Sequence, residues 1–306
     1  MEASSEPSGP QAPANRDAVS GAATTSDGRG GQIISLDQRR PLRDGRALVL
    51  IPTFNEARNV RGVVERVLDH VPADILIIDD DSPDGTGAIA DTIASNTPRV
   101  SVMHRPRKSG LGRAYVDGMK WALEREYDFV IQMDCDSSHD PGAAAGMLAG
   151  LEDAHVVVGS RYVPGGATVD WSRGRRIVSR IGSLYSRTLL HLPQRDATSG
   201  FKAWRSDLLR RIDLEDVRSN GYVFQVEMAF LAGNAGGVIA EVPIVFPNRE
   251  EGKSKLSLGI ISEALLLVLK LRMSRAPWRR AEQMPLALQA RLPQWSTTEQ
   301  EQRRAA

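Results

Sequence analysis

Hydrophobic positions follow two patterns along the chain between about Leu48 and about Leu271. Short apolar stretches, typical of buried strands, occur at residues 47–51, 75–78, 100–104, 129–133 and 154–159. Between the first four of them the sequence predicts helices over residues 59–70, 85–95 and 112–125, the first from valines at helical spacing. Strands that alternate with helices predict an α/β fold with a mostly parallel central sheet and helices on both faces.

Both ends of the chain lack these patterns. Residues 1–45 have no apolar core and no basic leader, so we expect a disordered tail and no secretory signal. The segment after Arg275 is rich in Arg, Gln and Pro. The sequence therefore predicts one folded domain over residues 46–273, an N-terminal tail over 1–45 and a C-terminal tail over 274–306.

Composition places the chain among ordinary globular proteins. Its 306 residues are 41% hydrophobic, which is enough for a buried core. Lysine and arginine exceed aspartate and glutamate by one, so the net charge gives no reason to expect nucleic acid as a partner. The single cysteine, Cys135, excludes an internal disulfide and is compatible with a reducing, cytoplasmic compartment.

Four polar segments follow predicted strands: residues 52–56, 79–84, 134–138 and 159–162. Because the carboxyl ends of parallel strands meet at one edge of a sheet, where ligands bind, we expect these segments to form one site. The first strand-to-helix turn has PTFNEARN where a dinucleotide-binding protein has its glycine-rich loop. No two of the five histidines have metal-ligand spacing, so the histidines are predicted to be mostly structural.

Three adjacent carboxylates, Asp79, Asp80 and Asp81, follow the second strand in the run IIDDDSPDGT. Like charges repel, so their crowding at a strand end favours a site that binds hydroxyls, amides or a cation. For Asp81, Ser82 and Asp84 a solvated turn with a helix cap is an equally good interpretation. For Asp80 we favour contact with a ligand.

Asp134 and Asp136 end a strand in DFVIQMDCDSSHD, two positions apart, so their side chains leave on the same side. Carboxylate oxygens suit Mg²⁺ or Mn²⁺, and one or two of them with substrate phosphates complete the usual octahedral shell. The sequence therefore predicts a divalent metal that arrives with a diphosphate. Ser138 or His139 either adds to this shell or caps the next helix.

Two later segments have the character of interfacial helices. Five arginines between residues 162 and 193 alternate with apolar residues, which suits a helix that lies on an anionic membrane, covers the site, or packs on the domain. Residues 258–271, LGIISEALLLVLKL, form a second apolar stretch. The roughly 14 residues between Lys255 and Lys270 are fewer than the roughly 20 that span a bilayer, so we expect a buried or interfacial helix.

A series of motifs in the chain resembles a known family. The motifs, in order, are IPTFNEARN, IIDDDSPDGT, KSGLGRAY, MDCDSSHDP, VVGSRYVPGG, TSGFKAW, SNGYVFQVEM and PIVFPNREEGKSK. This set, spread over residues 47–271, resembles the polyprenol-phosphate mannosyltransferases, also called dolichol-phosphate mannose synthases, and most of all their actinobacterial members, the polyprenol monophosphomannose synthases. The resemblance implies glycosyltransferase family 2, the GT-A (Rossmann-like) fold and inversion at the transferred sugar.

The resemblance also implies roles for individual residues. The donor, GDP-mannose, would be held by Pro52, Phe54, Glu56, Ile78, Asp80, Asp134, Cys135, Asp136, Arg161, Arg249 and Lys255. The metal, Mg²⁺ or Mn²⁺, would be bound by Asp134, Asp136 and Ser138, and the acceptor phosphate by Arg161, Arg175 and Arg249. Asp136, Arg249 and Lys255 would carry catalysis.

The implied reaction transfers mannose from GDP-mannose to a polyprenyl phosphate and gives polyprenyl-phospho-β-mannose, a lipid-linked mannose donor for protein glycosylation. With no predicted span, the protein would be peripheral on the cytosolic face of the membrane, with or without a separate membrane-anchoring protein. Two alternatives stay open: a glucosyl-lipid synthase on the same fold, and a non-catalytic polyprenyl-phosphate-binding protein.

Five positions depart from the family pattern: Phe54 replaces Tyr, Asp81 replaces Asn or Gly, Cys135 replaces Ala, Ser137 replaces Leu and Asn248 replaces Asp. None of these changes removes a metal carboxylate or a phosphate-binding cation. The missing tyrosine hydroxyl and the missing aspartate leave the fine donor preference open.

Overall fold

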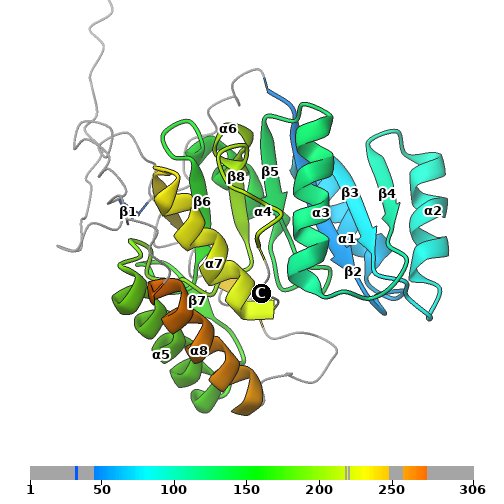
Figure 1. The fold of residues 1–306 in the computed structure, drawn as a ribbon. Coiled ribbons are helices and arrows are strands. Elements are labelled where there is room, and N and C mark those ends of the chain that lie inside the picture. The colour runs from blue at the N-terminus through cyan, green and yellow to red at the C-terminus, as the bar shows by residue number, and fades with distance from the viewer. Residues whose placement is uncertain (1–31, 34–44, 218, 220, 248–257, 274–306) are drawn as a thin grey trace, which may run out of the picture.

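The computed structural model describes residues 32–33, 45–217, 219, 221–247 and 258–273 of the chain (Figure 1). Their centre is an eight-stranded sheet in the order β1-β9-β6-β8-β5-β2-β3-β4. Its strands are β1 (Gln32–Ile33), β2 (Ala47–Thr53), β3 (Asp74–Asp79), β4 (Val100–His104), β5 (Phe129–Gln132), β6 (Val156–Ser160), β8 (Lys202–Arg205) and β9 (Ile239–Pro243). Neighbouring strands run parallel except β8, which is antiparallel to β5 and β6. A second, short parallel sheet pairs β7 (Ala167–Thr168) with β10 (Val245–Phe246).

Helices cover both faces of the large sheet. The helices of the two layers are α1 (Val60–His70), α2 (Thr86–Asn96), α3 (Leu111–Glu124), α4 (Pro141–Gly150), α6 (Ser206–Leu209) and α7 (Gly221–Asn234), and the described part also contains α5 (Arg173–Leu190) and α8 (Leu258–Met273). Successive residues of a strand point to opposite faces, so Val49 and Ile51 of β2 enter the apolar cluster with α1, α2 and α4. Leu48 and Leu50 enter the cluster with α3, α6 and α7. The sheet is therefore buried on both sides, as its apolar strands predicted.

Helices α5 and α8 lie outside these two layers, side by side and next to α7 (Figure 1). A third apolar cluster joins them through Leu190 of α5, Phe230 of α7 and Val268 of α8. The Tyr185 hydroxyl of α5 donates to the carbonyl oxygen of Leu265 in α8 at 3.2 Å. A helix with the length and hydrophobicity of a membrane span is not found among the described residues.

The strands and helices predicted from the sequence lie within two residues of the observed ones. At the N-terminal end, Gln32–Ile33 pair with β9 although the sequence places them in a disordered tail, and β7 to β10, α6 and α7 lie in segments for which the sequence predicted no strand or helix. A two-residue strand carries too little pattern to be predicted, because its hydrogen bonds are made by backbone groups. Gly45, the last residue of the predicted N-terminal tail, is described. The remaining residues of the two predicted tails, 1–31, 34–44 and 274–306, lie outside the described part.

Candidate active site

The loop after β5 carries the acidic pair on the carboxyl edge of the sheet. Asp134 and Asp136 are half-buried, while Cys135 between them is 3% exposed and belongs to the apolar cluster with α1 and α4. Burial raises the pKa of the Cys135 thiol well above its usual value, and the charges of Glu56, Asp136 and Asp134 raise it further. Cys135 is therefore a protonated core side chain, which gives a packing reason for a small apolar residue at this position.

Two aromatic side chains hold Asp134 in place. The Tyr115 hydroxyl of α3 donates to Asp134 Oδ1 at 2.9 Å, and the backbone N–H of Asp134 donates to His139 Nδ1 at 2.9 Å. The His139 ring stacks on Phe201 with 4.7 Å between the ring centroids. Burial, followed by the charge of Asp134, raises the pKa of Tyr115 well above its usual value, so Tyr115 acts as a hydrogen-bond donor at neutral pH.

Ser138 and His139, whose roles the sequence left open, take different positions. Ser138 donates both its N–H, at 3.1 Å, and its hydroxyl to Asp136 Oδ1. His139 Nδ1 accepts the N–H of Asp134 and is therefore unprotonated. Asp140 caps α4 by accepting the N–H of Gly142 at 2.9 Å. Ser138 thus lies beside the acidic pair, and neither Ser138 nor His139 supplies the helix cap.

Gly200 lies beside the acidic pair. A Cβ at this position would lie 3.7 Å from Asp134 Oδ2 and 3.7 Å from Gln225 Nε2. The Gln225 side chain is buried, and its Nε2 has no hydrogen-bond partner among the described residues. A buried N–H group without a partner costs about 1–3 kcal/mol of stability, so a ligand oxygen at this place would remove a penalty.

The described residues suit a metal that is shared with a ligand. No group of three or more His, Cys, Asp or Glu side chains in the described ranges could hold a metal ion by itself. Asp134, Asp136 and the adjacent Ser138 supply hard oxygen atoms of the kind that Mg²⁺ and Mn²⁺ prefer. Two carboxylates leave most of an octahedral shell to ligand oxygens and water, so this set fits a divalent cation that binds with a diphosphate.

The carboxylate of Asp80, after β3, already has protein partners. Asp80 is 5% exposed, forms an ion pair with Arg105 and accepts from the N–H groups of Ser109 and Gly110, each at 3.3 Å. Arg105 also contacts Asp117 of α3 at 3.0 Å. Asp80 therefore ties the end of β3 to the start of α3, and the donor contact predicted for it would add to this network.

The neighbours of Asp80 organise the turn after β3. Asp79 accepts from the Thr53 hydroxyl at 3.2 Å and from the Ser82 hydroxyl at 2.6 Å. Asp84 accepts from the N–H of Thr86 at 3.1 Å and from its hydroxyl at 2.6 Å, at the start of α2. For Asp84 the structure thus shows the turn that was part of one of its two interpretations, while the N-cap residue of α2 is Gly85.

Four further residues of the predicted donor site lie at the ends of β2 and β3. Pro52, Phe54 and Glu56 are half-buried along the carboxyl edge. Lys108 Nζ lies 3.5 Å from the centroid of the Phe54 ring. Ile78 is fully buried in the cluster with α3, so a contact of Ile78 with a nucleoside would have to come from its backbone.

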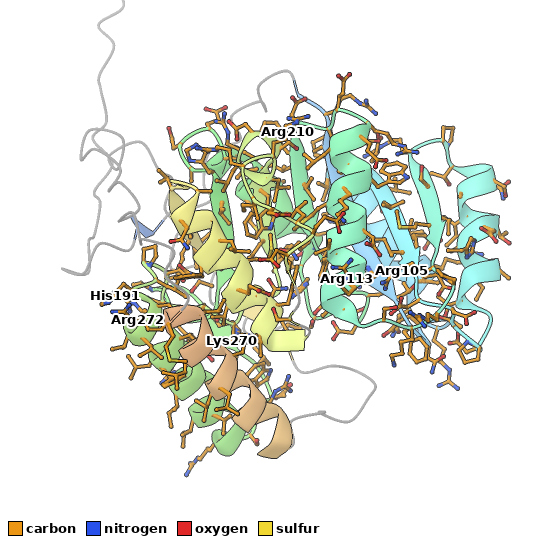
Figure 2. All side chains as sticks on the ribbon, viewed as in Figure 1. Arg105, Arg113, His191, Arg210, Lys270 and Arg272 are labelled. Atoms are coloured by element: carbon orange, nitrogen blue, oxygen red, sulfur yellow. The ribbon has the colours of Figure 1, made fainter. Side chains whose placement is uncertain are left out.

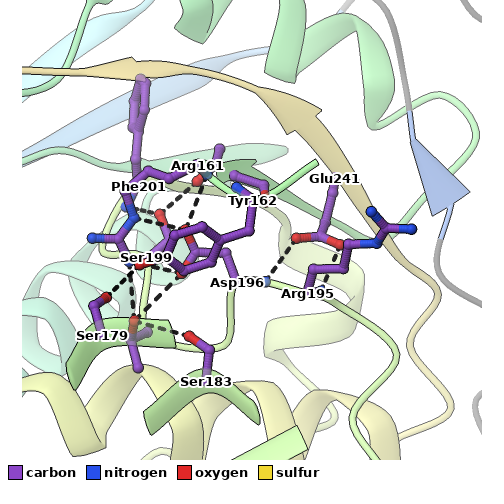
Figure 3. A network of polar contacts seen from close by, with 12 residues as sticks. Arg161, Tyr162, Ser179, Ser183, Arg195, Asp196, Ser199, Phe201 and Glu241 are labelled. Carbon is purple, nitrogen blue, oxygen red and sulfur yellow. Dashed lines mark hydrogen bonds and ion pairs between the residues drawn. The ribbon is translucent and has the colours of Figure 1, made fainter. Parts of the chain in front are cut away.

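Arg161, directly after β6, belongs to a buried ionic network (Figure 3). Its Nε and Nη2 atoms each lie 2.7 Å from the Asp196 carboxylate, and its N–H donates to the same carboxylate at 3.0 Å. Glu241 of β9 extends the network by accepting from the N–H groups of Arg195, at 2.7 Å, and Asp196, at 2.9 Å. Arg161 thus fixes the segment before β8, and the phosphate contact implied for it stays a prediction.

Aromatic rings connect the acidic loop with two of the predicted cations. Phe246 of β10 lies edge-on to His139, with 5.4 Å between centroids, and the Arg161 guanidinium lies 5.4 Å from the same Phe246 ring. Arg175 of α5 lies 3.8 Å from the centroid of Trp171, and Trp171 meets Phe246 edge-on at 5.6 Å. The Phe246 ring therefore links the acidic loop with Arg161 directly and with Arg175 through Trp171.

Two predicted site residues lie outside the described part of the structure, and two observed ones were not predicted from the sequence. Arg249 and Lys255, two predicted cations, lie outside the described residues. In the other direction, Tyr115 and Asp196 were missed by the sequence analysis. Tyr115 belongs to the motif KSGLGRAY, where a polar-tipped aromatic residue on a helix was the available signal. Asp196 gave no signal, because its partner Arg161 is 35 positions away.

Comparison with known sequences confirms the family resemblance. Residues 48–213 match the family model of glycosyl transferase family 2. The undecaprenyl-phosphate mannosyltransferase of Micrococcus luteus is 47% identical over 226 residues, which cover 74% of this chain and 93% of that protein. The polyprenol monophosphomannose synthase of Mycolicibacterium smegmatis is 45% identical over 226 residues, which cover 73% of this chain and 85% of that protein.

Solved structures share the fold at lower identity. Glucosyl-3-phosphoglycerate synthase from Mycobacterium tuberculosis, in complex with phosphoglyceric acid, matches with a TM-score of 0.54 at 20% identity and covers 75% of this chain and 80% of its own. Mannosyltransferase PcManGT from Pyrobaculum calidifontis, in complex with GDP-Man and Mn²⁺, matches with a TM-score of 0.50 at 15% identity and covers 78% and 64%. These likenesses concern the fold, which is of the GT-A type. By the family model and the two relatives, the chain belongs to glycosyl transferase family 2 and, within it, to the polyprenyl-phosphate mannosyltransferases.

Proposed function

We propose that the protein transfers mannose from GDP-mannose to a polyprenyl phosphate, with inversion and with Mg²⁺ or Mn²⁺ at Asp134 and Asp136. The product would be polyprenyl-phospho-β-mannose. The observation that carries the proposal is the half-exposed acidic pair on the carboxyl edge of the sheet, supported from behind by Tyr115 and His139. The names of the two relatives support mannose and a polyprenyl phosphate. Because the acceptor is a membrane lipid, the protein would act as a peripheral protein on the cytosolic face.

Asp134 and Asp136 would present oxygen atoms to the metal and the diphosphate. When bound, the metal would supply Lewis-acid stabilisation of the departing diphosphate. Tyr115 occupies Asp134 Oδ1, so Oδ2, on the side of Gly200, is the oxygen that faces a ligand. Gln225 Nε2, beside the same space, would donate to an oxygen of the sugar or the diphosphate.

The donor's nucleoside would lie at the ends of β2 and β3. Pro52, Phe54 and Glu56 follow one another along this edge and are half-buried, so each keeps surface for a ligand. The Phe54 ring offers a flat face, and Lys108, next to it, offers a positive charge. Asp80 would contact the donor while keeping its ion pair with Arg105.

The acceptor phosphate needs no strong general base. A phosphate monoester has a second pKa of about 6, so it is largely ionised at neutral pH. In the described part of the site, His139 Nδ1 is used to accept the N–H of Asp134 and does not take up a proton from a substrate. A phosphate oxygen would attack the anomeric carbon while the bond from that carbon to the GDP oxygen breaks on the opposite face.

Positive charge would then stabilise the departing diphosphate and the acceptor phosphate. Arg175, Arg249 and Lys255 are the cations that we propose for direct contact. Arg161 is held by Asp196 through two N–H groups, so it would contribute its electric field and the position of the loop after β6. Preorganised charge of this kind commonly accounts for about 10²–10³ in rate for each contact.

Labelled sugar separates this proposal from its alternatives. The protein is incubated with labelled GDP-mannose, Mg²⁺ or Mn²⁺ and polyprenyl phosphate, and the mixture is extracted with organic solvent. We expect label in the organic phase, and none after chelation of the metal. Labelled UDP-glucose is the control for a glucosyl-lipid synthase. Label that stays in the aqueous phase with both donors contradicts the proposal, and lipid binding in that case would indicate a non-catalytic protein.

A further inference from the structure

Gln225 of α7 has a buried donor group next to the acidic pair. Gln225 is 2% exposed, and its Nε2 has no hydrogen-bond partner among the described residues. A carbon atom added to Gly200 would lie 3.7 Å from Gln225 Nε2, 3.7 Å from Asp134 Oδ2 and 3.8 Å from His139 Cε1. These are ordinary van der Waals distances, so the position has room for one atom. We call the position bounded by these four residues the Gly200 niche.

Lys202 of β8 determines which end of the Gln225 amide faces the Gly200 niche. Lys202 is fully buried, and its ammonium donates to the side-chain oxygen of Gln225 at 3.0 Å and to its backbone carbonyl oxygen at 2.7 Å. Because an ammonium group only donates, the amide atom that it contacts must be the oxygen. The amide nitrogen is therefore held on the side of the niche.

Helix α7, which carries Gln225, is held against α3. Phe224 stacks on Tyr115, the tyrosine behind the acidic pair, with 5.9 Å between the ring centroids. Arg113 of α3, labelled in Figure 2, donates from Nη1 to the carbonyl oxygen of Val217, in the segment before α7, at 3.2 Å. The packing of two helices thus sets the position of Gln225 relative to the acidic pair, as a preorganised binding contact requires.

The Gly200 niche offers one acceptor and one donor. Asp134 Oδ2 accepts hydrogen bonds, and Gln225 Nε2 donates them. A hydroxyl group does both at a single oxygen, so it satisfies both atoms. A phosphate oxygen only accepts, and its negative charge would be repelled by the Asp134 carboxylate. The residues around the niche therefore favour a hydroxyl group over an oxygen of the diphosphate.

We propose that the Gly200 niche binds one hydroxyl group of the donor's sugar, which accepts from Gln225 Nε2 and donates to Asp134 Oδ2. Gln225 then helps to determine which sugar the protein accepts, because a sugar without a hydroxyl at this place leaves Nε2 unpaired. Lys202 is a positioning residue that acts through the Gln225 amide.

The inference rests on the proposed function, whose donor is GDP-mannose. In that proposal Asp134 binds the metal together with the diphosphate, and the sugar is attached to the same diphosphate. A carboxylate oxygen has two lone pairs, so Asp134 Oδ2 can contact the metal and a sugar hydroxyl at once. Gly200 and Asp134 are both partly exposed, which places the niche next to the surface on which the donor would lie.

Donor analogues test the Gln225 contact. Values of kcat/KM for sugar transfer are compared between GDP-mannose and its 2-deoxy, 3-deoxy, 4-deoxy and 6-deoxy analogues. With one analogue, the parent should lose about tenfold or more, because the Gly200 niche is left without its hydroxyl. Gln225→Leu should show a similar loss with GDP-mannose and with the three other analogues. With the sensitive analogue it should lose little more than the parent, since the same contact cannot be lost twice.

Two further variants change the Gly200 niche with little change in packing. Gln225→Glu keeps an oxygen for Lys202 but replaces the N–H donor with a second oxygen, so transfer from GDP-mannose should fall by about tenfold or more. Gly200→Ala fills the niche with a methyl group at ordinary contact distances and should lower transfer as well. Gly62→Ala, on the exposed side of α1, is the matched control and should transfer like the parent, because its Cβ would meet no described atom within 4 Å.

Lys202→Met tests the positioning role, because the Gln225 amide loses the donor that fixes its orientation. The preference for GDP-mannose over the sensitive analogue, as a ratio of kcat/KM values, should fall by about two- to tenfold. In the Gln225→Leu background, Lys202→Met should leave this ratio unchanged. A purely structural effect of Lys202 would instead lower transfer from both donors by the same factor.

Binding without transfer separates the sugar from the diphosphate. Calorimetry in the presence of Mn²⁺ measures the binding of GDP-mannose and of GDP, which has no sugar. Gln225→Leu should weaken the binding of GDP-mannose by about two- to tenfold and leave the binding of GDP unchanged. If Gln225→Leu does not fold, as judged by circular dichroism, Gln225→Glu takes its place, because it keeps the contact with Lys202.

Three results would overturn the inference. They are parent-like transfer from GDP-mannose by Gln225→Leu, an equal loss in this variant with GDP-mannose and with every analogue, and weaker binding of GDP as well as of GDP-mannose. The second result would show that Gln225 only supports the fold. The third would place the Nε2 contact on the diphosphate.

The proposed function can fail separately. A parent that binds GDP-mannose in the Gln225-dependent manner but transfers no label to polyprenyl phosphate contradicts the proposed function and leaves the inference standing. A parent that transfers mannose, with Gln225 variants that behave like it, contradicts the inference and leaves the proposed function standing.

Discussion

The ends of β5 and β6 carry charged residues on the same edge of the sheet, but the two regions differ in what reaches them. Asp134 and Asp136 are half-buried; the Asp134 carboxylate accepts from the Tyr115 hydroxyl, and the Asp136 carboxylate accepts from the N–H and the hydroxyl of Ser138. Arg161 and Asp196 are 7% and 0% exposed and form a bidentate pair. The first region leaves its carboxylates partly exposed, as the proposed ligand site requires, and the second holds a loop and α5 in place (Figure 3).

The difference follows from what packs over each strand end. Gly200 leaves no Cβ in front of Asp134 Oδ2. At β6, the segment before β8 brings Asp196 onto the arginine, and Trp171 and Phe246 lie within 5.4 Å of its guanidinium. A charged residue at the end of a buried strand is therefore a candidate for either role. The packing around the residue decides whether its side chain stays accessible to a ligand or holds a neighbouring loop.

Removal of the buried carboxylate should have the largest effect on stability. Asp196→Ala leaves the Arg161 guanidinium buried without its partner, which typically costs about 3–5 kcal/mol in the free energy of unfolding. Chemical denaturation followed by circular dichroism measures this loss. The double variant Arg161→Met, Asp196→Leu removes both charges and should recover part of it. An unchanged denaturation midpoint in Asp196→Ala would mean that the pair has no supporting role.

Removal of a half-buried carboxylate of the acidic pair should instead affect activity. Asp136→Ala is expected to lower sugar transfer by about 10²–10³, because it takes away one preorganised contact to the metal and diphosphate. Its denaturation midpoint should fall less than that of Asp196→Ala, because Asp136 is half-buried and its removal takes one acceptor from the N–H and the hydroxyl of the buried Ser138. Normal turnover of Asp136→Ala with metal present would remove the acidic pair from the mechanism.

The buried region should also show a specific pH dependence. Burial lowers the pKa of Lys202 to about 7, and the charge of Asp196 partly offsets this. An unfolded lysine keeps its proton up to about pH 10.4. Between these values the unfolded chain binds more protons, so this group makes the free energy of unfolding rise with pH by up to about 1.4 kcal/mol per unit.

Lys202→Met isolates this contribution. The parent's free energy of unfolding, minus that of the variant, should grow from pH 7 to pH 9, because only the parent loses a buried positive charge over this range. Urea denaturation at the two pH values measures the difference. Parallel pH profiles of parent and variant would show that the Lys202 amine, which donates to Gln225 at 2.7 Å, does not titrate in this range.

The smallest expected effect concerns the support behind the acidic pair. Tyr115→Phe removes the hydroxyl that fixes Asp134 Oδ1, and the loss of one hydrogen bond of about 0.5–1.5 kcal/mol corresponds to about two- to tenfold. We expect a change of this size, about two- to tenfold, in the metal concentration needed for half-maximal transfer. Tyr127→Phe removes an equivalent hydroxyl from Asp74, away from the site, and should leave this concentration unchanged.

The fold was largely predictable from the sequence, and the site was predictable in part. The acidic pair follows a four-residue apolar strand, so its place on the carboxyl edge could be inferred. The support for Asp134 could not, because Tyr115 and His139 reach it from different segments of the chain. For Ile78, a predicted donor contact, the sequence did not show that the packing of α3 against β3 buries the side chain and leaves only the backbone for such a contact.

The sequence by itself determined the alternation of strands and helices, and with it the edge of the sheet on which Asp134 and Asp136 lie. This is so because strand and helix periods are local properties of neighbouring residues. Only the tertiary structure decided that Cys135 packs in the core, that Arg161 belongs to Asp196, and that Lys202 of β8 lies against the Gln225 amide of α7. These outcomes depend on which faces pack together, and contacts between distant segments have no local pattern.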